Sequence, residues 1–241
     1  MEQVFLSDAE LYFTDQPVAD KKIVITGDES HHLINVMRHQ TGDTVFITDG
    51  IGNIYKSEIN VIEKKKINCT IVNTIRYTND LSRFWFCLPR LKNPARLEFA
   101  LEKCVELGIT KFIIFDSKRT VAKGGKIDRW EKILLSAMKQ SLRSWLPKIF
   151  YVNNLSKLFI LEGPKILFDQ NAGTTMHSFL PILNSQFADL NCYFIFGPEG
   201  GLSEEELKSE SVSYKIKLTD NRLRSETSIV TAASFLAMKN L

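Results

Sequence analysis

The chain contains few of the residues that cross-link small proteins or bind metal ions. It has four cysteines and four histidines among 241 residues. No C-x-x-C pair occurs among Cys69, Cys87, Cys104 and Cys192, and no H-E-x-x-H sequence is present. Scattered cysteines are typical of reduced thiols in a reducing compartment and speak against a zinc site. We therefore expect no bound metal.

A long apolar run is also missing from the sequence. No segment approaches the roughly 18 apolar residues of a membrane-spanning helix. The N-terminal sequence MEQVFLSDAELYF has acidic residues where a signal peptide needs a basic start and an apolar centre. The apolar fraction of 44% and the charged fraction of 24% are those of a globular protein and exclude a disordered chain. We expect a cytoplasmic protein with no membrane partner.

Positive charge is concentrated in one part of the chain. Residues 1–75 contain seven Lys/Arg and eleven Asp/Glu, whereas residues 111–148 contain ten Lys/Arg and only three Asp/Glu. A concentrated basic surface attracts polyanions through contacts with phosphate groups and the release of counterions. The basic segment therefore indicates a nucleic-acid partner, and a solvated helix face is the alternative.

The first third of the chain predicts a small β-barrel. Turns that contain glycine separate short runs of alternating or β-branched residues, a pattern typical of strands. One helix is expected from His31 to about His39, with Ser30 as its N-terminal cap. The expected strands are 22–26, 44–49, 54–62 and 68–76.

The rest of the chain predicts a mostly parallel sheet. The polar segment Tyr77–Ser82 is the expected linker, which divides the chain into domains 1–76 and 82–241. After the linker, apolar strands alternate with helices, and this order gives a parallel sheet covered on both faces. The expected strands are 84–88, 111–115, 149–152, 166–168, 192–196 and 214–218, and the expected helices are 94–107, 128–145, 204–210 and 226–240.

A glycine-rich loop, GPEGG at 197–201, follows the strand 192–196. Ligands of an open parallel sheet bind beyond the carboxyl ends of its strands, where this loop lies. Ser203 and Glu206 form a capping box at the next helix. Three glutamates open that helix and disfavour a phosphate at its N-terminus. The loop therefore favours a ligand with little negative charge, and a purely structural turn is the alternative.

A second polar loop lies between the last strand and the last helix. Its sequence, LTDNRLRSET at 218–227, places charges of both signs at the same edge of the sheet. Ser225 is the expected cap of the last helix. Arg224 and Glu226 are close enough in sequence to form an ion pair with each other.

These two loops, in this order, resemble those of the RsmE family of bacterial ribosomal RNA methyltransferases. That family belongs to the SPOUT class of knotted, S-adenosylmethionine-dependent methyltransferases. The resemblance covers nearly the whole chain, and the ordered set of motifs is more specific than any single motif. The motifs are His31-His32-Leu33 with Val36, Arg38 and Gly42-Asp43; Lys92, Glu98, Lys103 and Glu106-Leu107-Gly108; Arg119, Arg129-Trp130, Gln140-Ser141, Arg143 and Pro147; residues 197–201; and Leu223-Arg224 with Glu226-Thr227.

Five positions depart from the residues that are usual in the family. The family usually has an acidic residue at Lys139, glycine at Leu142 and Thr219, arginine at Asn221 and alanine at Ser228. These departures do not alter the expected fold. They concern the contacts to the cofactor around 219–221 and those to RNA near Leu142.

The resemblance implies an α/β fold, in which a SPOUT-type parallel sheet with a C-terminal trefoil knot follows a small PUA-like β-barrel. It also implies that S-adenosylmethionine binds in a bent shape between the loop after Phe168 and the two loops described above. This cofactor carries no phosphate, which agrees with the glutamates at 204–206. The implied cofactor-binding residues are Phe196, Gly197, Pro198, Glu199, Gly200, Gly201, Leu218, Asn221, Leu223 and Thr227.

The implied reaction is methylation of N3 of a uridine in 16S ribosomal RNA, within the small ribosomal subunit. The imide nitrogen must lose a proton, so Glu226 is the candidate base and Arg224 the candidate stabiliser of the developing anion. For each of these two residues a structural role is the alternative. The expected RNA contacts are Arg38, Arg119, Lys123, Arg129 and Arg143.

The resemblance further implies a homodimer. Two other functions stay open at this point. The chain could be a non-catalytic RNA-binding module, or a methyltransferase of the same class that acts on another RNA or another base. The intact glycine-rich loop favours an enzyme over a scaffold.

Overall fold

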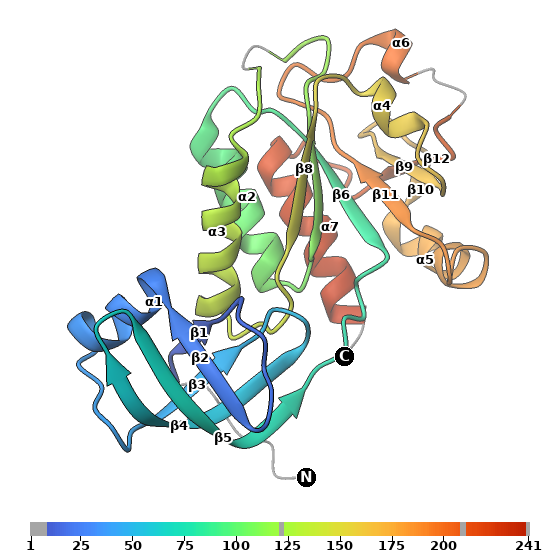
Figure 1. Ribbon diagram of the computed structural model, residues 1–241. Coiled ribbons are helices and arrows are strands. Elements are labelled where there is room, and N and C mark those ends of the chain that lie inside the picture. The colour runs from blue at the N-terminus through green and yellow to red at the C-terminus, as the bar shows by residue number, and fades with distance from the viewer. Residues whose placement is uncertain (1–8, 121–122, 208–210, 240–241) are drawn as a thin grey trace. The chain divides into compact units, whose positions relative to one another are not determined.

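The structure is a computed structural model that describes residues 9–120, 123–207 and 211–239. The chain divides into two compact units (Figure 1). The N-terminal unit extends to Asn79 and also contains Ser136–Leu146. The C-terminal unit contains Asp80–Leu135 and the chain from Pro147 onward. The expected domain boundaries, 1–76 and 82–241, stay a prediction, and the assignment of 136–146 to the N-terminal unit was not expected.

The N-terminal unit is built on a five-stranded sheet with the order β1-β3-β4-β5-β2. Its pairs are antiparallel except for the parallel pair β1–β3. All five strands contribute buried side chains to one core, and Thr14 Oγ1 donates to the Val24 carbonyl (2.5 Å) across the two edge strands. The sheet therefore curls around its core as expected for a small barrel. The strands are β1 (Leu11–Phe13), β2 (Lys22–Thr26), β3 (Thr44–Thr48), β4 (Asn53–Glu63) and β5 (Lys66–Arg76).

The helix of this unit begins earlier than the sequence predicts. Helix α1 (Gly27–His31) continues directly into a π-helical turn, η1 (His32–Val36). The expectation that Ser30 caps a helix starting at His31 is therefore wrong. Ser30 is buried inside α1, and its hydroxyl donates to the Gly27 carbonyl (2.8 Å) instead of to a free backbone amide. The Gly27-Asp28 pair that suggested a turn opens the helix.

Residues 136–146 contain the end of helix α3 (Ile127–Gln140) and the segment after it. The helix was expected to reach Trp145, but it ends at Gln140 because Leu142 adopts a left-handed conformation (φ +55°). The Leu142 N–H donates to the Lys139 carbonyl, and the Arg143 N–H donates to the Met138 carbonyl, which is a Schellman ending. Glycine is the usual residue at such a position, and here the leucine side chain instead packs against Leu11 and Ile54.

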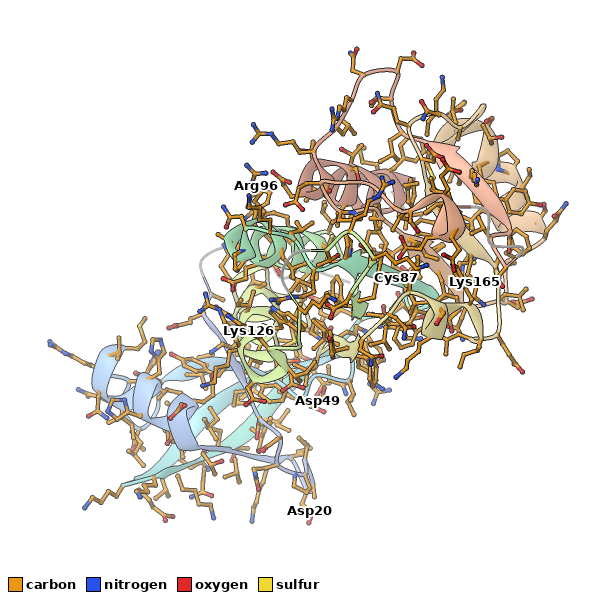
Figure 2. All side chains as sticks on the ribbon, turned by 90° about the horizontal axis from the view of Figure 1, so that it is seen from above. Asp20, Asp49, Cys87, Arg96, Lys126 and Lys165 are labelled. Atoms are coloured by element: carbon orange, nitrogen blue, oxygen red, sulfur yellow. The ribbon has the colours of Figure 1, made fainter. Side chains whose placement is uncertain are left out.

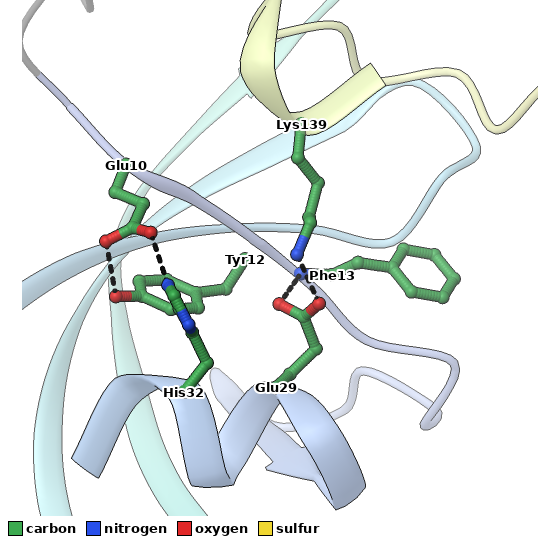
Figure 3. A network of polar contacts seen from close by, with 6 residues as sticks. All are labelled: Glu10, Tyr12, Phe13, Glu29, His32 and Lys139. Carbon is green, nitrogen blue, oxygen red and sulfur yellow. Dashed lines mark hydrogen bonds and ion pairs between the residues drawn. The ribbon is translucent and has the colours of Figure 1, made fainter. Parts of the chain in front are cut away.

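A polar network within the N-terminal unit connects the last turn of α3 to α1 and β1 (Figure 3). Lys139 forms an ion pair with Glu29 of α1, and the second carboxylate oxygen of Glu29 accepts a hydrogen bond from the Phe13 N–H (3.2 Å). The Lys139 and Glu29 side chains are only 25% and 16% exposed. Lys139, one of the five positions that depart from the usual residues of the family, thus has an ion-pair partner in this chain. In the same network, Glu10 bridges His32 (2.8 Å) and the Tyr12 hydroxyl (2.9 Å).

The C-terminal unit contains a seven-stranded sheet with the order β10-β12-β9-β11-β6-β7-β8. Every pair of neighbouring strands is parallel. The expected parallel sheet is therefore confirmed, and its trefoil knot stays a prediction. The strands are β6 (Phe84–Pro89), β7 (Lys111–Phe115), β8 (Lys148–Val152), β9 (Lys165–Phe168), β10 (Thr174–Thr175), β11 (Cys192–Ile195) and β12 (Tyr214–Lys217).

Helices lie on both faces of this sheet. Helices α2 (Pro94–Glu106) and α7 (Ser225–Lys239) pack side by side on one face, and α4 (Ser156–Phe159) lies on the other (Figure 1). Helix α5 (Met176–Ser185) packs against β12, and α6 (Glu204–Leu207) follows the glycine-rich loop. Neither α4 nor α5 was expected from the sequence. No helix in the described part of the chain is long and apolar enough to cross a membrane.

The segment expected to be a linker is partly built into the N-terminal unit. The Tyr77 N–H donates to the Gly52 carbonyl (2.8 Å), and the Trp145 indole N–H donates to the Tyr77 carbonyl (3.0 Å). The chain leaves the N-terminal unit after Asn79, returns to it at Ser136 and leaves it again after Leu146.

The Lys139–Glu29 pair predicts a specific effect on stability. The substitution Lys139→Glu places two carboxylates together at a mostly buried position, so we expect the free energy of unfolding to fall by about 2 kcal/mol. Urea denaturation measures this change. The exposed turn residue Lys64, replaced by Glu, is the control for the same change in net charge. The pair has no role in stability if Lys139→Glu and Lys64→Glu unfold at the same urea concentration.

Candidate functional site

A cavity of about 650 Å³ opens at the carboxyl ends of β9, β11 and β12. These three strands are neighbours in the sheet, so their following loops meet at one edge. The walls come from 168–171 after β9, from the glycine-rich loop after β11 and from 216–225 after β12, together with Arg96 at the start of α2. The cavity is therefore made by the same three loops that the sequence analysis singled out.

Aromatic rings stack beside the cavity. Phe168 lines it, and the Phe168 and Phe196 rings are parallel within 5° with centroids 4.6 Å apart. Phe196 is fully buried and also contacts Phe86 of β6 (5.5 Å between centroids). Phe196 was expected to bind the cofactor, but it lies against Phe168 and does not line the cavity. It supports the wall from within the core.

The glycine-rich loop turns tightly and leaves space on the cavity side. The Gly201 N–H donates to the Pro198 carbonyl (2.9 Å), and Gly201 has a φ of +70°, which favours glycine. A Cβ built on Gly197 meets nothing closer than Leu202 at 3.8 Å. A Cβ on Gly200 faces Arg119 (3.7 Å), and Gly200 is not among the residues that line the cavity. Gly197 and Gly201 are therefore the glycines of this loop that line the cavity.

Three hydrogen bonds fasten this loop to other elements of the unit. Ser225 Oγ donates to the Gly197 carbonyl (2.8 Å), and Arg119 donates to the Gly200 carbonyl (3.1 Å). The Glu199 carboxylate accepts from the Lys92 backbone N–H (3.2 Å). The expectation that Ser225 caps the last helix is wrong, because α7 begins at Ser225 itself and the hydroxyl bonds the glycine-rich loop.

The capping box predicted at α6 is present. The Ser203 N–H donates to Glu206 Oε2 (2.7 Å), and the Glu206 N–H donates to Ser203 Oγ (3.3 Å). The second oxygen of Glu206 accepts from the Lys118 N–H (3.0 Å), so the basic segment 118–119 is docked on α6 as well as on the loop. Glu206 is largely buried by these contacts.

Glu226 pairs with a residue that sequence reasoning missed. Arg96 Nε lies 3.4 Å from Glu226 Oε1. Arg96, which is labelled in Figure 2, also lines the cavity. Glu226 is buried, and its Oε2 has no hydrogen-bond partner among the described residues. Arg224 is exposed at the cavity wall and takes no part in this ion pair. The sequence held no clear signal for Arg96, because the two partners are 130 positions apart.

Most of the other expected cofactor-binding residues line the cavity. Thr227 is exposed and does not line it, and neither does Glu226. The wall also contains residues that were not expected, namely Asp169, Gln170, Asn171, Lys217, Thr219, Arg222, Ser225 and Ser228. The expected residues that line it are Gly197, Pro198, Glu199, Gly201, Leu218, Asn221, Leu223 and Arg224.

The expected RNA contacts are divided between the two units. Arg119, Lys123 and Arg129 belong to the C-terminal unit and are exposed, and Arg129 forms a two-pronged ion pair with Glu98 (2.6 and 2.8 Å). Arg38 and Arg143 belong to the N-terminal unit and are exposed too. Arg38 adopts a left-handed conformation (φ +59°) directly after the π-helical turn.

Comparison with known proteins gives a consistent result. Residues 84–237 match the family model described as an RNA methyltransferase domain, and residues 25–72 match an RNA methyltransferase PUA domain. The ribosomal RNA small subunit methyltransferase E of Bacillus subtilis is 28% identical over 88% of each chain.

Two solved structures are similar over almost the whole length. One, described as a hypothetical protein, has a TM-score of 0.81 and 27% identity over 95% of this chain and 98% of its own. The other is the methyltransferase E of Neisseria gonorrhoeae bound to S-adenosylmethionine, with a TM-score of 0.80 and 20% identity over 96% and 98%. At that identity the second likeness concerns the fold. With the family model covering 154 residues of the chain, this protein belongs to the RNA methyltransferase family, and a PUA domain precedes its methyltransferase domain.

Proposed function

We propose that this RNA methyltransferase transfers the methyl group of S-adenosylmethionine to N3 of a uridine in 16S ribosomal RNA. The observation that carries the proposal is the cavity that three loops form at the carboxyl edge of the parallel sheet. The names of the curated relatives, which are small-subunit ribosomal RNA methyltransferases, support the choice of RNA. A non-catalytic RNA-binding scaffold would not need such a cavity.

The cavity suits a donor that has no phosphate. When bound, S-adenosylmethionine supplies an electrophilic methyl group on a positively charged sulfur. Asp169 and Glu199 bring carboxylates to the wall, and the glutamates of α6 occupy the helix N-terminus where a phosphate would otherwise bind. The space at Gly197 lets the ligand approach the backbone closely. We propose that the loops hold the donor through these groups.

Two residues carry the proposed chemistry. Glu226 would accept the proton of the uridine N3 at its unpartnered Oε2 once its carboxylate turns from its buried position toward the cavity. Bound S-adenosylmethionine would supply the methyl group to this nitrogen and leave as S-adenosylhomocysteine when its bond from sulfur to the methyl carbon breaks. Arg224, exposed at the cavity wall, stabilises the negative charge on the uracil ring. Arg96 acts as a positioning residue, because its ion pair holds Glu226 beside the cavity that Arg96 itself lines.

The remaining assignments complete the proposal. Arg38, Arg119, Lys123, Arg129 and Arg143 contact the RNA, since guanidinium and ammonium groups suit phosphates and stacked bases. The PUA domain positions the RNA, and the enzyme acts in the cytoplasm as a homodimer on the small ribosomal subunit.

The proposed reaction is tested by mass spectrometry of nucleosides from purified 16S ribosomal RNA. A strain without this protein is expected to lack 3-methyluridine at one position, and expression of the wild-type chain is expected to restore it. If 3-methyluridine is unchanged and a different methylated nucleoside disappears, the protein acts on another base. If no nucleoside changes in any RNA, the enzymatic proposal is wrong.

The cofactor site predicts that Gly197→Val abolishes donor binding. The valine methyl groups would enter the cavity, so we expect the affinity for S-adenosylmethionine to fall at least tenfold by isothermal titration calorimetry. Gly200→Ala is the matched control, because its Cβ makes only an ordinary contact with Arg119. Equal affinities for Gly197→Val and the wild type would remove the glycine-rich loop from the donor site.

The proposed base predicts that Glu226→Gln lowers the rate of methyl transfer by about 100-fold, because general-base catalysis contributes about that factor. Donor affinity is expected to stay near wild type, since Glu226 does not line the cavity. The melting temperature is expected to fall, because glutamine removes the ion pair with Arg96. A variant that loses thermal stability but keeps its rate per folded molecule would assign Glu226 a structural role.

A further inference from the structure

Part of the sheet face that carries α4 is exposed at Lys148 and Phe150 in the described part of the C-terminal unit. Toward the carboxyl ends of the strands this face is covered, since Leu158 of α4 packs in one cluster with Cys87 and Ile113. Toward the amino ends it carries Trp85, Lys111, Lys148, Phe150 and Tyr193, which we call the Trp85 surface. Both faces of a parallel sheet are normally covered, so an open part of a face indicates a partner.

The aromatic rings of the Trp85 surface form a continuous row. Trp85 of β6 is paired with Tyr193 of β11 in the sheet register, and their rings are stacked with centroids 6.1 Å apart. On the other side, the Phe150 ring of β8 lies 5.8 Å from the Trp85 ring. Phe150 is 51% exposed, Trp85 is half-buried and Tyr193 is buried. The row therefore has a rigid buried end and an exposed end at Phe150.

Beyond Tyr193 the same row ends at a lysine whose ammonium group already has hydrogen-bond partners. Lys165 of β9 pairs with Tyr193 in the register, and its ammonium group lies over the Tyr193 ring (5.0 Å). It is buried and donates to the Gly163 carbonyl (2.8 Å). Lys165 and Cys87 lie on the same face of the sheet, because Lys165 pairs through Tyr193 with Trp85, two residues before Cys87. Lys165 thus closes the buried end of the row and has a structural role.

The two lysines at the exposed end lie opposite each other without a counter-ion. Lys111 of β7 and Lys148 of β8 are paired in the register, and neither forms an ion pair with any described residue. The Lys111 ammonium lies over the Trp85 ring (5.0 Å), and its burial together with nearby Lys148 lowers the pKa of Lys111. Like charges directly opposite each other destabilise a sheet. A bound anion would remove this repulsion.

We infer that the Trp85 surface binds a single-stranded segment of the RNA substrate that flanks the target nucleotide. This inference rests on the proposed function. Bases stack on Phe150 at the end of the aromatic row, and phosphates contact Lys111 and Lys148. The surface lies at the amino ends of the strands and the cavity at their carboxyl ends, so about 13 Å of strand separates them. The segment bound here is therefore not the reacting uridine.

Charge decides between RNA and a second copy of the chain. In a symmetric dimer the same surface contacts itself, so Lys111 and Lys148 would face the lysines of the partner. The five residues of the Trp85 surface include no carboxylate that could neutralise the facing lysines. The phosphates of an RNA strand neutralise both lysines, and its flat bases can stack on the exposed ring of Phe150.

The test uses the full-length protein and a labelled single-stranded RNA of mixed sequence, about 12 nucleotides long. Fluorescence anisotropy is expected to show that Lys148→Glu and Phe150→Ala each bind this RNA at least fivefold more weakly than the wild type. Lys215→Glu is the control, because Lys215 is an exposed lysine of β12 outside the surface and gives the same change in charge. Lys148→Glu is expected to melt at or above the wild-type temperature, since its carboxylate would pair with Lys111.

A second readout locates the contact. After ultraviolet cross-linking and trypsin digestion, the peptide that contains Phe150 is expected to carry nucleotide in the wild type and not in Lys148→Glu. This peptide is 149–157 in the wild type and 144–157 in the variant, which lacks the cleavage site at residue 148. Equal RNA binding by Lys148→Glu and Lys215→Glu would overturn the inference while leaving the proposed function in place. A change in oligomeric state of Phe150→Ala in sedimentation analysis would instead assign the surface to a contact between copies. If the wild type binds neither RNA nor S-adenosylmethionine, the proposed function itself fails.

Discussion

Three parallel strands that are far apart in sequence end next to one another, and the rest of the site depends on this constraint. The chain forms β9, β11 and β12 at residues 165–168, 192–195 and 214–217, and the sheet places β9 between the other two. Because all three strands run in the same direction, their loops leave the sheet at one edge. A cavity with walls from three separate loops follows directly.

Hydrogen bonds from outside the three loops then fix the shape of that cavity. The glycine-rich loop is held through its carbonyl groups by Ser225 and Arg119 and through the Glu199 carboxylate by the backbone at Lys92. The basic segment 118–119 is thereby connected to the wall of the cavity. Arg119 was expected to contact RNA, and it holds the loop while remaining exposed.

The sequence predicted the sheet well because strong apolar strands and well-placed capping residues carry local information. The strand at 111–115 and the capping box of Ser203 and Glu206 are present as expected. The elements that were missed are short, such as β1 and β10, which have three and two residues. Such elements form because neighbouring strands offer hydrogen bonds, and a local pattern cannot reveal this.

The errors in the predicted partners of polar side chains have a common physical cause. Serines were assigned as helix caps from local sequence, yet Ser30 bonds a carbonyl within its own helix and Ser225 bonds the glycine-rich loop. The partner of Glu226 was sought at Arg224, two positions away, whereas the structure supplies Arg96 from another helix. Most of the residues expected to bind the cofactor line the cavity, and their role stays a prediction. What they contact depends on tertiary packing, which the sequence alone does not specify.

The most direct measurement is a crystal structure of the chain grown with S-adenosylmethionine. The account predicts the donor between the loops after β9, β11 and β12, with its methyl group facing the side of the cavity that Arg96 and Arg224 line. A donor bound elsewhere on the chain, or a cavity that stays empty at saturating donor, would contradict it.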